Sequence, residues 1–284
     1  MSADNVLIIG SNGQLGKALQ QLYPDAKLAD INELDITSKA SVDNYDWSGI
    51  KVILNAAAYT NVDGAETPDG KIAAWKVNDE AVGYLATVAN AKDLLLVHIS
   101  TAYVFDGQKN SYTEQDDPNP LGEYAKSKAA GDTKAAGVAK HYILRTDSVV
   151  GDGKNFVRTM LELGKKGVSP KVVADQMIRP TFSPLLAGAV KFLIDNSVAY
   201  GIYNLTNDGD VVSWADFTRA IFGEAGFELN VTDTTFAEYS SGKEGVAPRP
   251  LNSVLDLSKI EGAGFKPRDW REDLKEYIKK EDLK

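Results

Sequence analysis

Residues 6–16 read V-L-I-I-G-S-N-G-Q-L-G, and this stretch is the strongest indication of fold in the chain. Its first four residues are apolar, which is typical of a strand in a parallel sheet that is covered on both faces. Glycines follow at positions 10, 13 and 16, and residues 14–22 are compatible with a helix. A strand, a glycine-rich turn and a helix in this order predict a dinucleotide-binding α/β unit.

Each glycine has its own physical role in such a turn. Gly10 permits a tight turn, Gly13 lets the backbone approach a pyrophosphate, and Gly16 lets the helix pack closely, while the helix N-terminus attracts the anion. The same pattern also occurs in ordinary strand-to-helix turns, but here it follows the first strand directly. We therefore expect a nicotinamide cofactor to contact Gly10, Asn12, Gly13, Gln14, Leu15 and Gly16.

Short apolar runs alternate with helix-period segments over the first 150 residues, which predicts a doubly wound parallel sheet, a Rossmann-like α/β fold. We expect strands at 5–9, 26–29, 51–54, 94–100 and 141–145, and helices at 14–22, 72–91 and 124–136. The later part has a less regular spacing, with helices near 155–163, 185–194 and 213–225 and from 271 to the end, and strands at 171–173 and 201–205. We expect residues 1–150 to form a dinucleotide-binding domain and residues 151–284 a smaller substrate-binding lobe. Segments near 184–206 and 247–256 are expected to pack back onto the first domain.

The composition limits the possible functions. A chain of 284 residues with 43% hydrophobic content can bury a full core, and a net charge of -9 argues against binding nucleic acid or acidic membranes through a basic surface. Without cysteine the chain has no disulfide or thiolate nucleophile, which suits the cytoplasm. We find no segment long enough to span a membrane and no signal-peptide pattern. Both histidines, His98 and His141, lie in or beside apolar strands, so we predict no metal site.

A second informative stretch, at residues 95–128, places Thr101 at the end of an apolar strand and Tyr124 and Lys128 in the following helix. The Y-x-x-x-K spacing also occurs by accident at Tyr23 and Tyr239, but Pro24 and the Ser-Ser-Gly sequence at 240–242 make those segments incompatible with a helix. In a helix, residues four apart share one face. We expect Lys128 to lower the pKa of Tyr124 from about 10. Thr101 can bind the carbonyl oxygen that gains charge during hydride attack.

Asp30 is the acidic residue expected about 20 residues after the glycine turn, where it can accept a hydrogen bond from the ribose 2′-hydroxyl. The alternative is that Asp30 is only a solvated turn residue. No arginine occurs between Gly16 and Arg145 to bind a 2′-phosphate, although Lys27 or Lys39 could do so. These observations favour NADH over NADPH.

Further motifs follow one another along nearly the whole chain. They are L-D-I-T at 34–37, N-A-A-A-Y-T-N-V-D-G-A-E at 55–66, H-I-S-T-A-Y-V-F-D-G at 98–107, D-Q-M-I-R-P-T at 175–181, G-I-Y-N-L-T-N at 201–207 and R-P-L-N-S-V-L-D at 249–256. Together with the glycine turn and the Tyr124–Lys128 pair, they resemble the extended short-chain dehydrogenase/reductases, and more narrowly the dTDP-4-dehydrorhamnose reductase family.

The resemblance implies an enzyme of dTDP-rhamnose biosynthesis that uses NADH or NADPH to reduce the 4-keto group of a dTDP-linked 6-deoxyhexulose. Thr101, Tyr124 and Lys128 would be catalytic: Tyr124 would donate the proton, and Lys128 would also hold the nicotinamide ribose. Other cofactor contacts would come from Asp35 and Ile36, which border the adenine, and from Ala56, Ala57 and Tyr59. The nucleotide-sugar side would contain Val62, Ala102, Tyr103, Ser148 and Arg249, and the planar guanidinium of Arg249 suits a diphosphate.

The chain departs from the family's pattern at two positions on the substrate side. Ala102 stands where the family usually has the aspartate of S-T-D-Y-V-F, and Ser148 stands where it has the tryptophan of R-T-S-W or R-T-A-W. Two alternatives therefore stay open: a reductase or epimerase for another nucleotide sugar, and a non-catalytic regulatory subunit like the family member that regulates methionine adenosyltransferase. We expect a monomer or a homodimer. Some relatives dimerise around a metal held by acidic residues, but Lys17 follows the glycine turn here, so we predict no such site.

Overall fold

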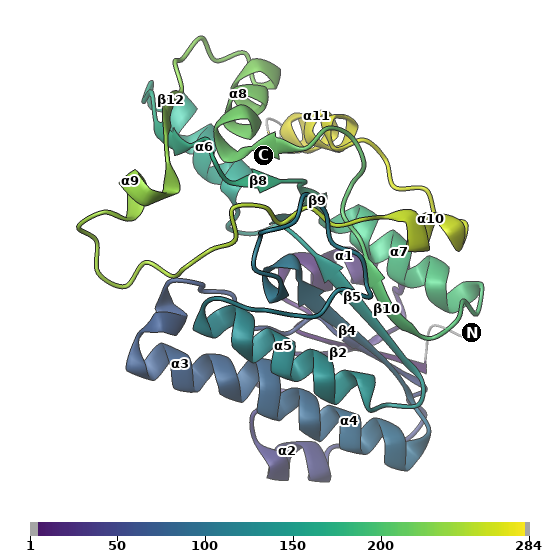
Figure 1. Cartoon of the computed structure of the whole chain (residues 1–284). Coiled ribbons are helices and arrows are strands. Elements are labelled where there is room, and N and C mark those ends of the chain that lie inside the picture. Colours follow the sequence, from purple (N-terminus) through teal and green to yellow (C-terminus); the bar gives the residue numbers. More distant parts are fainter. Residues whose placement is uncertain (1–4, 282–284) are drawn as a thin grey trace.

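The computed structural model describes residues 5–281, and a six-stranded parallel sheet lies at its centre (Figure 1). Its order is β10-β5-β4-β3-β1-β2. The chain adds β2 on one side of β1 and then β3, β4 and β5 on the other, so the order reverses beside β1. The predicted doubly wound α/β fold is confirmed. Its strands are β1 (Val6–Ile9), β2 (Lys27–Ala29), β3 (Val52–Asn55), β4 (Leu95–Thr101), β5 (His141–Thr146) and β10 (Gly201–Asn204).

Helices cover both faces of the sheet, which is why its central strands β1 and β3 are buried along their whole length. Side chains alternate between the two faces of a strand. Val6 and Ile8 pack in one hydrophobic cluster with α1 (Gln14–Leu22) and α7 (Ser183–Asp195). Leu7 and Ile9 pack in another with α2 (Lys39–Asn44), α4 (Ala81–Lys92) and the end of α5 (Glu123–Ala136). Figure 1 shows α4 and α5 side by side on that second face.

The helix predicted at 72–91 differs from the structure in its start and its regularity. It begins as α3 (Pro68–Trp75), because Thr67 caps it by accepting a hydrogen bond from the Gly70 N–H at 3.1 Å. A π-helical turn, η3 (Lys76–Glu80), then joins α3 to α4. Within that turn the buried Asn78 binds both backbone groups of Tyr59 and donates to the Ser127 hydroxyl at 3.0 Å. The turn therefore fixes the segment after β3 against α5.

The remaining chain builds a smaller hydrophobic cluster around α6 (Phe156–Lys165), α8 (Trp214–Glu224) and α11 (Trp270–Glu281). The predicted start of α8 is present, since the Ser213 hydroxyl accepts from the Asp216 N–H at 3.0 Å. The helix expected from residue 271 to the end is α11, and residues 282–284 of that prediction lie outside the described residues.

Short elements complete this part and its connections. They are η2 (Gly64–Glu66), η4 (Ala102–Val104), β6 (Val149–Val150), β7 (Lys171–Val173), β8 (Met177–Ile178), β9 (Thr181–Phe182), β11 (Val212–Ser213), β12 (Thr232–Thr234), α9 (Phe236–Ser240) and α10 (Ser258–Gly262). Between residues 5 and 281, no helix is both long and apolar enough to cross a membrane.

Candidate active site

A cavity of about 390 Å³ opens at the carboxyl ends of β1, β2 and β3, where the strand order reverses. Ligands of doubly wound folds bind at this edge of the sheet. Seven residues predicted to bind the cofactor line the cavity: Gly10, Gly13, Asp30, Asp35, Ile36, Ala56 and Ala57. The other lining residues are Ile9, Ile31, Leu34, Thr37, Ala58 and Val77. Leu34 and Thr37 flank the predicted adenine pair in the L-D-I-T motif, so that motif could have indicated them.

The backbone of the glycine turn leaves no space for side chains at two positions. Gly10 has a φ of 75°, and a Cβ atom there would lie 2.6 Å from the Ala57 nitrogen. A Cβ atom on Gly16 would lie 2.2 Å from the Gly10 carbonyl oxygen. Gly16 therefore lets α1 pack on the turn itself. Since no side chain caps α1 at Gly13, its first N–H groups are available to an anion.

Asp30 faces the glycine turn from the end of β2. Its carboxylate accepts hydrogen bonds from the Asn12 N–H at 3.1 Å and the Ile31 N–H at 2.9 Å. The two lysines considered for a 2′-phosphate have other partners: Lys27 donates to the Ser48 carbonyl at 3.3 Å, and Lys39 pairs with Asp43. The cavity thus has a carboxylate at the end of β2, beside the glycine turn.

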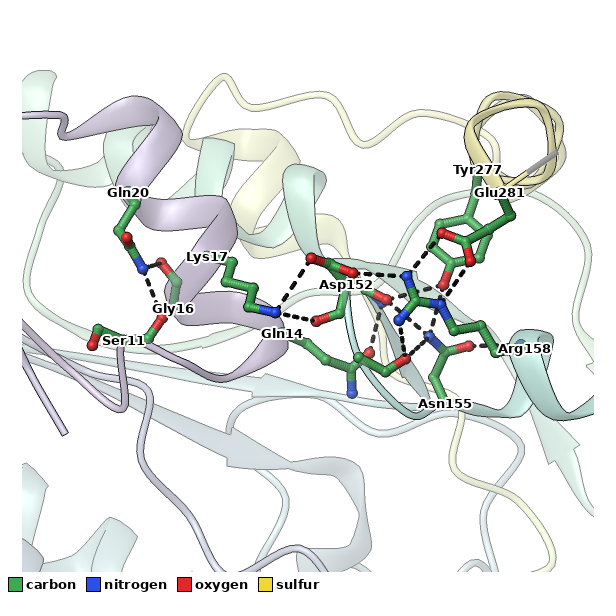
Figure 2. Close-up of polar contacts among 12 residues, drawn as sticks. Ser11, Gln14, Gly16, Lys17, Gln20, Asp152, Asn155, Arg158, Tyr277 and Glu281 are labelled. Carbon is green, nitrogen blue, oxygen red and sulfur yellow. Dashed lines mark hydrogen bonds and ion pairs between the residues drawn. The ribbon is translucent and has the colours of Figure 1, made fainter. Parts of the chain in front are cut away.

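The Gln14 side chain binds a loop from the C-terminal part of the chain. Its Oε1 atom accepts from the Gly151 N–H at 2.7 Å, and its Nε2 atom lies 3.4 Å from the Lys154 carbonyl oxygen. Lys17, one turn along α1, pairs with Asp152 in the same loop, with its Nζ atom 3.3 Å from Asp152 Oδ2. Figure 2 shows this contact between α1 and the loop. Arg158 then connects Asp152 to α11 (Figure 2). Gln14 was predicted to bind the cofactor but does not line the cavity. The same holds for Leu15 and Gly16, which are buried in α1.

The three predicted catalytic residues come together at the end of β4. Tyr124 and Lys128 lie one turn apart on α5, and the Thr101 hydroxyl is hydrogen-bonded to Tyr124. Thr101 also accepts from the Tyr103 N–H at 3.1 Å, and the rings of Tyr103 and Tyr124 meet edge to face at 6.4 Å. The start of α5 is held by Glu66, whose Oε1 atom accepts from the Glu123 N–H at 2.8 Å.

The prediction that Lys128 lowers the pKa of Tyr124 is wrong for this structure. Burial raises the pKa of Tyr124 to about 12, opposed by the hydrogen bond from Thr101. The Lys128 ammonium group instead donates to the Ile99 carbonyl oxygen at 2.6 Å. Burial also lowers the pKa of Lys128 to about 8, and the nearby Asp132 charge opposes that change. Tyr124 is therefore a phenol, a proton donor, at neutral pH.

The predicted substrate residues are in different environments. Arg249 pairs with Asp63 at 2.8 Å and is hydrogen-bonded to Tyr103, and the half-buried Val62 precedes Asp63. Ala102 has no exposed surface and packs with Val104 and Phe105, so its side chain faces the core and not an open site.

Ser148 has a φ of 45°, an uncommon conformation for a residue other than glycine. It follows Asp147, a buried carboxylate that the sequence reasoning missed. Asp147 is 5% exposed and accepts a hydrogen bond from the Ser253 hydroxyl at 2.5 Å. Burial raises the pKa of Asp147 to about 6, and its negative charge raises the pKa of both Tyr103 and Tyr124. Asp147 is therefore an electrostatic neighbour of the proton donor.

Comparisons with known proteins agree with this geometry. The family model described as "RmlD substrate binding domain" matches residues 4–283. A dTDP-4-dehydrorhamnose reductase from Aggregatibacter actinomycetemcomitans is 42% identical, covering 95% of this chain and 97% of its own length. The crystal structure of a dTDP-4-dehydrorhamnose reductase from Clostridium acetobutylicum has a TM-score of 0.88 and 37% identity, over 96% of this chain and 98% of that one. The enzyme of the same name from Bacillus anthracis, solved in complex with NADP, has a TM-score of 0.88 and 33% identity, over 97% and 98% of the two chains. This chain belongs to the dTDP-4-dehydrorhamnose reductase family.

Proposed function

We propose that this protein reduces the 4-keto group of dTDP-4-dehydro-L-rhamnose to give dTDP-L-rhamnose, with NADH or NADPH as the reductant. The observation that carries the proposal is the meeting of Thr101, Tyr124 and Lys128 at the carboxyl edge of the sheet that also holds the cavity of about 390 Å³. The sequence relationship to enzymes of that name supports the same activity.

The residues around the cavity fit a nicotinamide dinucleotide. The Gly10 backbone closes against Ala57 too tightly for any side chain, and the uncapped start of α1 offers N–H groups to a pyrophosphate. Asp35 and Ile36 also line the cavity and would border the adenine, and Asp30 could accept a hydrogen bond from a ribose hydroxyl. When bound, the reduced cofactor supplies the hydride.

The protein's own residues supply the proton and hold the carbonyl group. Because Tyr124 stays protonated at neutral pH, it can donate its phenolic proton to the oxygen that becomes a hydroxyl. The Thr101 hydroxyl, which is hydrogen-bonded to Tyr124, can also bind the substrate carbonyl oxygen and stabilise the charge that develops on it. Lys128, one turn from Tyr124 on α5, would hold the nicotinamide ribose. Arg249 binds the diphosphate, for which it must leave or share Asp63.

A second candidate substrate is another nucleotide-linked 4-keto sugar. Asp147 and Ser148 favour it, because a buried carboxylate and a short polar side chain would suit a sugar with a different arrangement of hydroxyl groups.

The activity is tested by incubating the purified protein with dTDP-4-dehydro-L-rhamnose and each nicotinamide, with cofactor oxidation and the sugar product measured together. We expect one dTDP-L-rhamnose per cofactor oxidised. Oxidation only with a different 4-keto sugar would select the second candidate. A protein that binds the cofactor but reduces none of these sugars would match a regulatory subunit instead.

A further inference from the structure

A row of buried polar side chains lies behind Lys128, and the proposed reaction uses only the lysine. We call Asn55, His98, Lys128 and Asp132 the lysine network. Their exposures are 1%, 0%, 1% and 4%, and they come from three neighbouring elements, β3, β4 and α5. Buried polar groups are costly unless each has a partner, so the contacts within the network restrict its protonation.

The contacts form a continuous chain. Asn55 and His98 are neighbours in the register of β3 and β4, and the Asn55 Nδ2 atom lies 3.3 Å from His98 Nδ1. The other ring nitrogen, Nε2, lies 3.3 Å from Lys128 Nζ and 3.8 Å from Asp132 Oδ1. Lys128 also donates to the Ile99 carbonyl oxygen at 2.6 Å. His98 is thus the link between Asn55 and the lysine.

The direction of these hydrogen bonds is set at the Asn55 end. The Ala57 N–H can only donate, and it donates to Asn55 Oδ1 at 3.3 Å. The amide nitrogen of Asn55 therefore faces His98 and donates to its Nδ1 atom. Burial, the larger cause, holds the pKa of His98 well below its ordinary value, so its ring is neutral. A neutral ring that accepts at Nδ1 carries its hydrogen on Nε2, facing Lys128.

This arrangement suits a neutral amine and not an ammonium group. An ammonium has three donors and no acceptor, so it cannot bind an Nε2–H group, whereas a neutral amine offers a lone pair. To accept from the ammonium, His98 must carry its hydrogen on Nδ1, and the Asn55 oxygen must turn toward the ring. Asn55 would then lose its bond from the Ala57 N–H. Each protonation state of Lys128 therefore has its own tautomer of His98.

We propose that His98, with Asn55, is a positioning residue that couples the proton on Lys128 to the cofactor cavity. The proposal rests on the proposed function, in which Lys128 holds the cofactor. Ala57 lines that cavity, and its N–H group is directed at the buried Asn55 oxygen, so a shift of this backbone on cofactor binding would free Asn55 to turn and let His98 accept from the ammonium. Binding of the cofactor thereby favours the charged lysine that the reaction needs.

The other charged groups around Lys128 do not replace this coupling. Tyr124 and Asp132 share α5 with it, and Arg145 on β5 pairs with Asp132 at 3.3 Å. Burial lowers the pKa of Lys128 to about 8, while the charge of Asp132 opposes that change. We therefore expect the change of tautomer near pH 8 in the cofactor-free protein.

Nitrogen-15 NMR of histidine-labelled full-length protein tests the coupling without any activity. The chain has two histidines, and His141→Gln assigns their signals. We expect the neutral His98 ring to carry its hydrogen on Nδ1 below about pH 8 and on Nε2 above it. In Lys128→Met the tautomer should stay the same at every pH. A constant tautomer in the wild type, or the same change in Lys128→Met, would overturn the proposal.

Kinetics separate positioning from a merely structural role. His98→Leu removes the acceptor, so kcat should fall roughly ten- to a hundredfold and the alkaline limb of its pH profile should move to lower pH. His98→Gln keeps an oxygen that can accept from the ammonium. It should therefore restore most of kcat and move the alkaline limb of the pH profile about one pH unit above its position in the wild type. His141→Gln is the control and should match the wild type. A wild-type pH profile in both His98 variants would contradict the proposal. If the wild type reduces no sugar but shows the coupling by NMR, the proposed function fails and the coupling stands.

Discussion

Replacing Asp147 with Asn should make the protein more stable at alkaline pH. Asp147 is 5% exposed, and burial raises its pKa from 3.8 to about 6. The folded protein therefore prefers the protonated carboxyl, whose stabilising effect is fully present below pH 3.8 and is lost as the pH rises through about 6. The ionised form costs about 3 kcal/mol above that range. Asn carries no charge and avoids this cost, but its weaker hydrogen bond to Ser253 should reduce the gain in stability by about 1 kcal/mol.

Urea unfolding at pH 5 and pH 8 measures the effect. We expect Asp147→Asn to raise the free energy of unfolding by about 2 kcal/mol at pH 8 and by less than about 1 kcal/mol at pH 5. Asp25→Asn, at an exposed position, is the matched control and should show no such pH dependence. A variant less stable than the wild type at pH 8, or equally affected at both pH values, would refute the reasoning.

Three further variants test the cavity and the substrate side. Gly16→Ala should abolish cofactor binding and lower the Tm, because its Cβ would lie 2.2 Å from the Gly10 carbonyl; retained affinity by fluorescence titration would contradict the packing argument. Asp30→Ala should weaken NADH binding about tenfold and leave NADPH binding less affected, since only the ribose hydroxyl donates to the carboxylate; equal losses would argue against that contact. Arg249→Ala should raise the KM for the nucleotide sugar and leave the affinity for NADH unchanged. Asp63→Asn, which removes the charge that pairs with Arg249, should not raise that KM. Unchanged kinetics in Arg249→Ala would show that Arg249 is not part of the site.

Much of the fold could be predicted from sequence because its sheet is covered on both faces. The run Val6 to Ile9 is apolar at every position, since alternate residues enter two different clusters. Of the seven predicted residues that line the cavity, Gly10, Gly13 and Asp30 could be predicted because a glycine turn after a strand leaves few other arrangements. Asp35, Ile36, Ala56 and Ala57 followed only from the resemblance to the reductase family. The short strands β6, β8 and β9 could not be predicted, because two residues carry no periodic pattern.

The sequence could not indicate properties that depend on distant partners. Gln14 binds Gly151, a residue 137 positions away, so its side-chain direction has no local signal. The effect of Lys128 on Tyr124 was mispredicted because spacing places both on one face of α5 but does not tell where the ammonium points. The π-helical turn around Asn78 was missed because it interrupts a pattern that continues as a helix on both sides.

The most direct measurement of the central claim compares Tyr124→Phe with Tyr239→Phe. Tyr239 has the same spacing to a lysine but is 41% exposed and does not line the cavity, so it controls for the loss of a phenol hydroxyl. With NADH or NADPH and dTDP-4-dehydro-L-rhamnose, we expect Tyr124→Phe to lower kcat by about 10² to 10⁴, with folding and cofactor affinity preserved. Tyr239→Phe should match the wild type. Equal kcat values for the two variants would contradict the assignment of Tyr124 as the proton donor.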